Sequence, residues 1–142
     1  MWRLKDESGF SYAMTAMLFA FAVLPLLLLS SYLGQMVSAK HALQNAADAA
    51  AEAAVAMVDV EHFRRTGDIV LTGDVYSVAQ YYADRTFVHI RAKGVRPQVV
   101  GIYVDEATNT VRVQVAGKMP VMFGYATTVH AEGSAQVRAF FR

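Results

Sequence analysis

The chain has 142 residues and a formal net charge of +1, and hydrophobic residues make up 55% of it. This length suits one domain, and a net charge so near zero excludes the strong positive field typical of nucleic-acid-binding proteins. The sequence contains no cysteine, which excludes a disulfide framework. The hydrophobic fraction is high for a soluble protein, so we ask where along the chain these residues lie.

The excess lies near the N-terminus. Residues 10–39 contain no charged side chain, and a bilayer span needs only about 20 apolar residues. The sequence therefore predicts one transmembrane helix. Arg3 and Lys5 precede it, and positively charged flanks tend to stay in the cytoplasm, so we expect the C-terminal domain outside. The apolar core of a secretory signal peptide is only about 7 to 15 residues long, so simple removal of this run is not expected.

Helical character is expected to continue to about Val60, because only Pro25 interrupts it. An interior proline removes a backbone hydrogen bond and clashes with the preceding turn, so we predict a helix kink at Pro25. This divides the chain into a leader (residues 1–9), a transmembrane and alanine-rich helix (10–60) and an extracytoplasmic α+β domain (61–142).

The alanine-rich segment LQNAADAAAEAA, residues 43–54, carries a stripe of small apolar residues at helical spacing. Such a face permits close backbone approach rather than filling space. Two partners are open: the protein's own domain, or other copies in a filament or bundle, and both can apply on different sides of the helix. The predicted helix-packing residues are Ala39, Leu43, Ala46, Ala50, Ala53 and Met57.

Beyond the long helix, residues 61–73 are interpreted as a connection with a short strand at 68–71. A second amphipathic helix of about five turns is expected from a cap at Thr72 or Asp74 to a stop at Gly94, with Tyr76, Ala79, Ala83, Phe87 and Ile90 on one face. The pattern then alternates with period two, which predicts strands at 98–104, 110–116 and 126–141, the last bent or bulged at Gly133. Residues 118–125 are expected to be a linker. The expected fold is thus α+β, with about three antiparallel strands.

No group of residues predicts chemistry. The four histidines, His41, His62, His89 and His130, lack the spacing of metal ligands. Asp105 and Glu106 are expected in a hairpin turn and lack the further oxygen ligands of a calcium loop. Arg64 and Arg65 are interpreted as solvated surface residues, with contact to lipid head groups or acidic partners as the alternative, and the same interpretation applies to Lys93 and Arg96. We therefore name no catalytic, cofactor-binding or metal-binding residue, and expect no enzyme and no cofactor.

Three features together resemble the TadE/TadG-like family of tight-adherence (Flp) pilus assembly proteins of bacteria. They are a leader ending at Gly9-Phe10, the core Pro25-Leu26-Leu27 and the segment LQNAADAA at 43–50. The C-terminal pattern is similar to the TadE branch. The resemblance implies a pilin-like domain and a minor pilin or pseudopilin role in the bacterial cytoplasmic membrane. The implied partners are the lipid bilayer, other pilin or pseudopilin subunits, the inner-membrane pilus platform and a prepilin peptidase.

Two questions stay open at this stage. Gly9-Phe10 resembles a prepilin-peptidase cleavage site, but the fifth mature position, usually glutamate, would be Met14, and the nearest polar groups, Tyr12 and Thr15, carry no charge. An uncleaved signal anchor is the alternative. The chain also fits a membrane-tethered extracytoplasmic binding module that is not built into a pilus.

Overall fold

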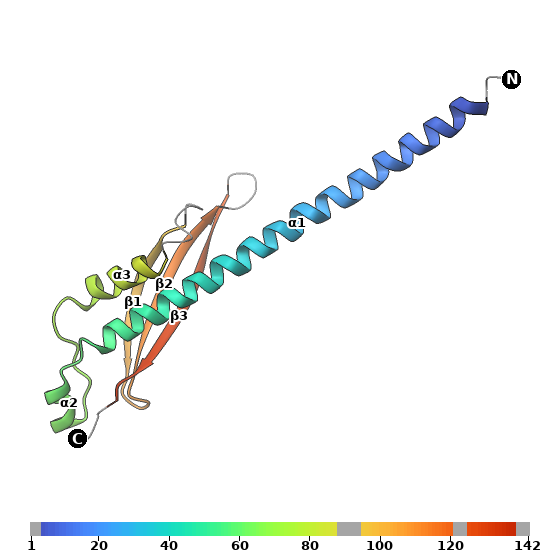
Figure 1. Cartoon of the computed structure of the whole chain (residues 1–142). Coiled ribbons are helices and arrows are strands. Elements are labelled where there is room, and N and C mark those ends of the chain that lie inside the picture. The colour runs from blue at the N-terminus through green and yellow to red at the C-terminus, as the bar shows by residue number, and fades with distance from the viewer. Residues whose placement is uncertain (1–3, 88–94, 121–124, 139–142) are drawn as a thin grey trace. The chain divides into compact units, whose positions relative to one another are not determined.

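The structure is a computed structural model that describes residues 4–87, 95–120 and 125–138. It confirms the predicted α+β class: a long apolar helix comes first, and two further helices and a three-stranded antiparallel sheet follow (Figure 1). The elements are α1 (Leu4–Val55), α2 (Val60–Thr66), α3 (Val75–Thr86), β1 (Pro97–Asp105), β2 (Thr110–Pro120) and β3 (Ala126–Gln136). The chain forms two compact units, Met1–Val37 and Ser38–Arg142, and α1 contributes to both.

The first unit consists of the N-terminal part of α1. This helix includes an 18-residue window of mean hydropathy 2.2, none of which is buried within the chain. It is long and apolar enough to span a membrane. The helix continues through Pro25, and the kink there stays a prediction.

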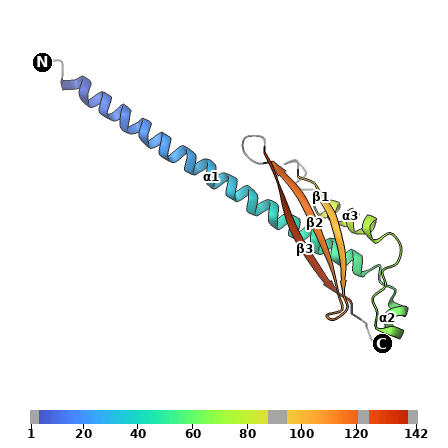
Figure 2. The same cartoon turned by 180° about the vertical axis from the view of Figure 1, so that it is seen from behind.

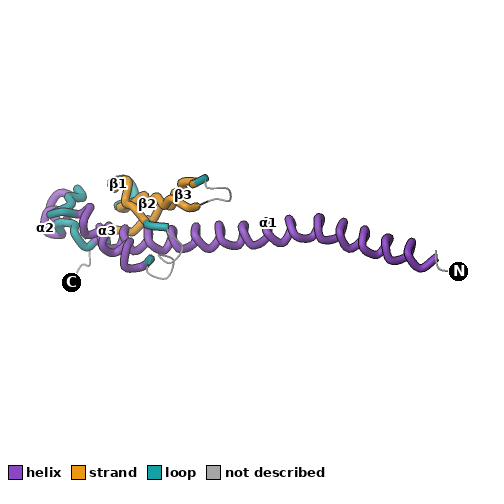
Figure 3. The backbone as a smooth tube through the Cα atoms, turned by 90° about the horizontal axis from the view of Figure 1, so that it is seen from above, coloured by secondary structure: helices purple, strands orange, loops and turns teal. Residues whose placement is uncertain are grey.

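The sheet of the second unit has the strand order β1-β2-β3, with antiparallel pairing throughout (Figure 2). Val111, Val113 and Val115 of β2 are fully buried, whereas Arg112 and Lys118 point to the exposed face. The alternation that predicts this strand thus also sets its buried face. Facing that buried side are α3 and the part of α1 that belongs to this unit (Figure 3).

Small residues bring α1 and the sheet into backbone contact. A Cβ atom built on Gly133 of β3 would lie 2.2 Å from both the carbonyl carbon and the carbonyl oxygen of Ala47. A Cβ on Gly117 of β2 would lie 2.9 Å from the Leu43 side chain and 3.1 Å from that of Val95. Glycine on the strands and alanine on the helix therefore allow an approach that larger side chains would prevent.

Several boundaries differ from the prediction. β2 extends to Pro120, through part of the expected linker, because Lys118, Met119 and Pro120 continue the alternation and pair with β3. β3 ends at Gln136 rather than at 141, and residues 139–141 lie outside the described part. Gly133 pairs in regular register with Val113, so the bulge predicted there is wrong. The register shift lies instead in β1, between Val99 and Gly101.

The connection between α1 and α3 also differs, because it contains the unpredicted helix α2. Asp59 caps its start by accepting hydrogen bonds from the backbone N–H groups of Glu61 (3.0 Å) and His62 (2.9 Å). Gly67, with φ of 83°, ends it in the left-handed conformation. The strand predicted at 68–71 is wrong, since only Leu71 forms an isolated bridge, with Val58.

The helix α3 begins as predicted and ends earlier. Asp74 is its N-cap, and the Asp74 carboxylate accepts a hydrogen bond from the backbone N–H of Ser77 at 3.2 Å. The helix ends at Thr86, and the predicted stop at Gly94 lies outside the described residues, as does Ile90. Tyr76 is 53% exposed, and the buried face of α3 is formed by other residues. That face carries Val75, Ala79, Ala83 and Phe87, which are four residues apart.

Candidate interaction surfaces

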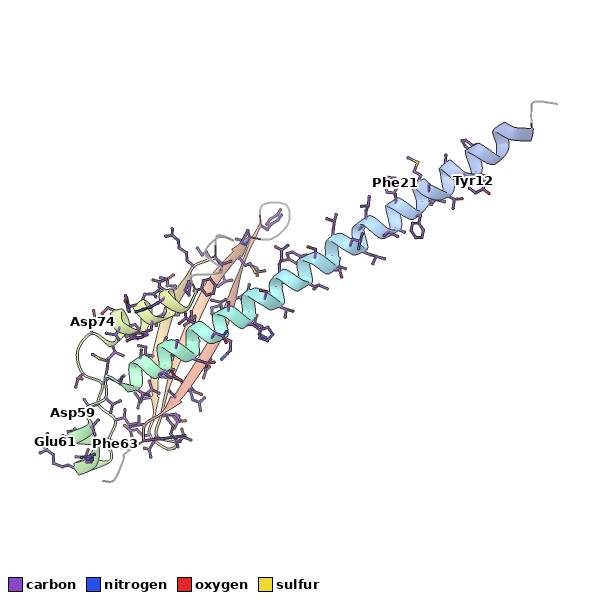
Figure 4. All side chains as sticks on the ribbon, in the orientation of Figure 1. Tyr12, Phe21, Asp59, Glu61, Phe63 and Asp74 are labelled. Atoms are coloured by element: carbon purple, nitrogen blue, oxygen red, sulfur yellow. The ribbon has the colours of Figure 1, made fainter. Side chains whose placement is uncertain are left out.

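The largest exposed apolar surface surrounds the N-terminal part of α1. Its side chains project on all sides of the helix, as the labelled Tyr12 and Phe21 illustrate (Figure 4), and these two are 79% and 71% exposed within the chain. Soluble proteins rarely expose contiguous apolar surface of this extent, which marks a membrane or protein partner. This surface is the candidate membrane-spanning surface.

The predicted cleavage site lies at the start of this surface. Gly9 and Phe10 are both within α1 and exposed, and apart from the adjoining helix backbone no described atom lies within 4 Å of the position that a Cβ on Gly9 would take. Met14 occupies the place of the usual glutamate and is 56% exposed. The Thr15 hydroxyl donates its single proton to the Ser11 carbonyl at 2.9 Å, so towards a neighbouring ammonium group Thr15 offers acceptor lone pairs and no charge.

The alanine stripe is buried inside the second unit. Ala39, Leu43, Ala46, Ala50 and Ala53 are between 0% and 8% exposed. Met57 lies beyond the helix end and is half-buried, and its methyl group would be 3.1 Å from a Cβ on Gly73. Within one chain the stripe therefore contacts the protein's own domain.

Tyr81 and Tyr82 of α3 form a second exposed aromatic surface, and Tyr76 is exposed on another side of the same helix. Tyr76, Tyr81 and Tyr82 are 53%, 57% and 46% exposed, and the rings of Tyr81 and Tyr82 meet edge to face with their centroids 5.5 Å apart. Exposed tyrosine is enriched at protein interfaces, because its ring is apolar and its hydroxyl stays solvated. This surface is suited to a protein partner.

The ionised residues at the β1–β2 turn stabilise the turn itself. The Asp105 carboxylate accepts a hydrogen bond from the Ala107 N–H at 3.1 Å and pairs with Arg112 at 3.1 Å. A hydrogen bond from the Thr108 side chain is the main cause that lowers the pKa of Asp105 below its ordinary value, and Arg112 contributes less. Within the described residues, no group of three or more His, Cys, Asp or Glu side chains could hold a metal ion.

Two glutamines bind the edge strands, and sequence reasoning missed both roles. The Gln80 side chain of α3 donates to the Pro97 carbonyl at 2.9 Å and accepts from the Val99 N–H at 2.8 Å. The Gln44 side chain of α1 donates to the Glu132 carbonyl at 2.7 Å. Helical spacing identifies the face on which each glutamine lies, but it does not identify a backbone partner on another element.

These surfaces define a class of protein: a chain with one N-terminal helix long and apolar enough to span a membrane, which continues into a small α+β domain. Residues 13–57 match the model of the family described as Tad, putative Flp pilus-assembly TadE/G-like. The family resemblance of the sequence is therefore confirmed over the apolar segment and the alanine-rich segment. The match supports involvement in Flp pilus assembly, with the membrane and pilus components as the general class of partner. No curated protein and no solved structure matches the chain.

Proposed function

We propose that this protein is a TadE-like minor pilin or pseudopilin that acts in assembly of a tight-adherence (Flp) pilus, with a structural rather than a catalytic role. The observation that carries the proposal is the continuity of α1 across the family match at 13–57. A single helix presents an exposed apolar surface in one unit and a buried alanine face in the other. Such a helix can anchor a domain in lipid and also offer an apolar surface to neighbouring subunits.

We place the protein in the bacterial cytoplasmic membrane with one span, the N-terminus in the cytoplasm and the α+β domain outside. Arg3 and Lys5 of the leader support this orientation. The proposed partners are other pilin or pseudopilin subunits and the inner-membrane platform, together with a prepilin peptidase if Gly9-Phe10 is cut.

The uncharged start of the helix favours a priming, tip or scaffold role over repeated incorporation into the fibre. The usual glutamate offsets the positive charge of a neighbouring subunit's terminal amine, and Met14 cannot do so. Thr15 can accept a hydrogen bond from that amine, which is weaker than an ion pair in an apolar environment.

A deletion strain tests the proposal directly. We expect loss of pili and of surface adhesion, both restored by the full chain expressed from a plasmid. Unchanged piliation in the deletion strain would refute a role in assembly. Mass spectrometry of the protein from native membranes then distinguishes a mature chain that starts at Phe10 from a permanent anchor with its leader intact.

A membrane-tethered binding module is the second candidate, and the exposed tyrosines of α3 favour it. In that case the span only tethers the domain, so replacing residues 10–37 with an unrelated span of equal length would preserve function. Replacing Tyr81 and Tyr82 by serine would abolish function in that case. We expect the opposite dependence, because pilin assembly relies on the helix itself.

A further inference from the structure

Basic side chains lie at one end of the second unit, where β1 begins and β2 ends. An open hollow there is lined by residues of α3 and all three strands, and its cationic groups are Arg96 and Lys118, both exposed. One carboxylate, that of Asp84, also lines the hollow, so the two cations leave an excess of positive charge. The remaining polar lining residues are Gln80, Gln98 and Thr128.

The opposite end of the sheet is acidic. The basic end of the sheet contains the strand pairs Pro97↔Gly117 and Lys118↔Thr128. The opposite end contains the pair Asp105↔Thr110. Residues 97–111 include Asp105 and Glu106 and no lysine or arginine. Arg112, the next cation, is within 3.1 Å of Asp105 and 3.6 Å of Glu132. Arg138 follows β3 at this same end, so Arg112 and Arg138 offset part of the negative charge of Asp105, Glu106 and Glu132.

The basic end is also the end at which α1 enters the second unit. Leu43 lies against Gly117, the neighbour of Lys118, whereas Ala47 lies against Gly133 farther along the sheet. Lys40 is the first charged residue after the apolar run and precedes Leu43 by three residues, or about 4.5 Å of helix.

We propose that Arg96 and Lys118 bind the phosphate groups of anionic phospholipids at the membrane surface. Electrostatic attraction to such a surface falls off within about one Debye length, about 8 Å at physiological ionic strength. Leu43, which lies against Gly117, follows Ala39, the last residue of the charge-free run, by four residues, or about 6 Å of helix. Val55, at the other end of α1, follows Ser38 by about 25 Å of helix. The proposal depends on membrane anchoring only, so it holds for a pilus subunit and for a tethered module.

The absence of cysteine allows spin labels to be placed singly on the full chain in vesicles. We choose Ala126→Cys at the basic end, outside the hollow, and Ser134→Cys as the matched control. Both residues are exposed on the same face of β3 and are eight residues, or about 26 Å, apart. A nickel ion chelated by a lipid headgroup increases the relaxation rate of a spin label near the membrane surface. In vesicles of about 70% phosphatidylcholine and 30% phosphatidylglycerol we expect strong relaxation at position 126 and little at 134.

Charge variants test the cause of that relaxation. Each basic residue near an anionic surface contributes a factor of about five, so R96Q/K118Q is expected to lower the ratio of docked to undocked domain about 30-fold. The control R65Q/R138Q removes equal charge within α2 and after β3, and should leave the ratio unchanged. Circular dichroism checks that each variant is folded.

Three results would overturn the proposal. Equal relaxation of position 126 in pure phosphatidylcholine vesicles would show that anionic lipid is not required. An equal loss of docked domain in R65Q/R138Q would indicate an effect of net charge rather than of Arg96 and Lys118. Displacement of the domain by millimolar inorganic phosphate at constant ionic strength would assign the hollow to a free anion.

Discussion

The contact between Gly133 and α1 predicts that one added methyl group destabilises the second unit. In Gly133→Ala the new Cβ would lie 2.2 Å from the Ala47 carbonyl group, and ordinary contact begins at 3.4 Å, so strand and helix must separate by about 1.2 Å. The obstructing atoms are backbone atoms, so no side-chain rotation relieves the clash. Overpacking of this kind costs about 1–3 kcal/mol and occasionally more, and we expect about 3 kcal/mol here.

The assay is urea unfolding of the full chain in detergent micelles, followed by circular dichroism. For a urea m-value of about 1.5 kcal/mol/M, the midpoint should fall by about 2 M. Ser134→Ala, at an exposed neighbouring position, is the control and should change the midpoint little. Because the clash involves the backbone of Ala47, adding Ala47→Gly should not restore stability. An unchanged midpoint for Gly133→Ala, or rescue by Ala47→Gly, would refute the reasoning.

Three further predictions concern hydrogen bonds. Gln80→Met removes the acceptor of the Val99 N–H, so this amide should lose its protection from hydrogen exchange. Gln80→Glu keeps an acceptor oxygen and should retain most of the protection. Equal protection of Val99 in both variants would contradict the role of Gln80 as its hydrogen-bond acceptor. Because the pKa of Asp105 is lowered in the folded state, its contribution to stability is present above the ordinary value of 3.8 and is lost as the pH falls through and below it. Asp105→Asn and Thr108→Val should therefore weaken the acid dependence of urea unfolding, and an unaltered pH profile would exclude this account. Asp59→Ala should destabilise α2 by about 1 kcal/mol, seen as faster amide exchange across its first turn, and unaltered exchange there would argue against the cap.

Sequence periodicity predicts the elements whose environment is uniform along their length. The charge-free run predicts the apolar part of α1, and the alternation around Val113 predicts β2 and its buried face. The family match at 13–57 covers most of α1 and none of the sheet. In each case a repeated pattern over many residues outweighs local exceptions.

The failures occur where one local contact decides the structure. Glycine in a strand indicates either a bulge or close approach of another backbone, and the sequence does not distinguish the two at Gly133. The short helix α2 depends on two hydrogen bonds to Asp59 and on the positive φ of Gly67, so it leaves almost no periodic signal. The hollow around Arg96 and Lys118 joins residues from four elements, which only the fold brings together.

The two glutamines that bind backbone groups of β1 and β3 affect how neighbouring copies of the chain can associate. An outermost strand with open N–H and C=O groups is a template on which a neighbouring molecule can add its own strand. Gln80 binds two such groups on β1 and Gln44 binds one on β3, and these strands are the two edges of the sheet. Copies concentrated in the plane of a membrane are thereby hindered from fusing their sheets, and association through side chains is favoured.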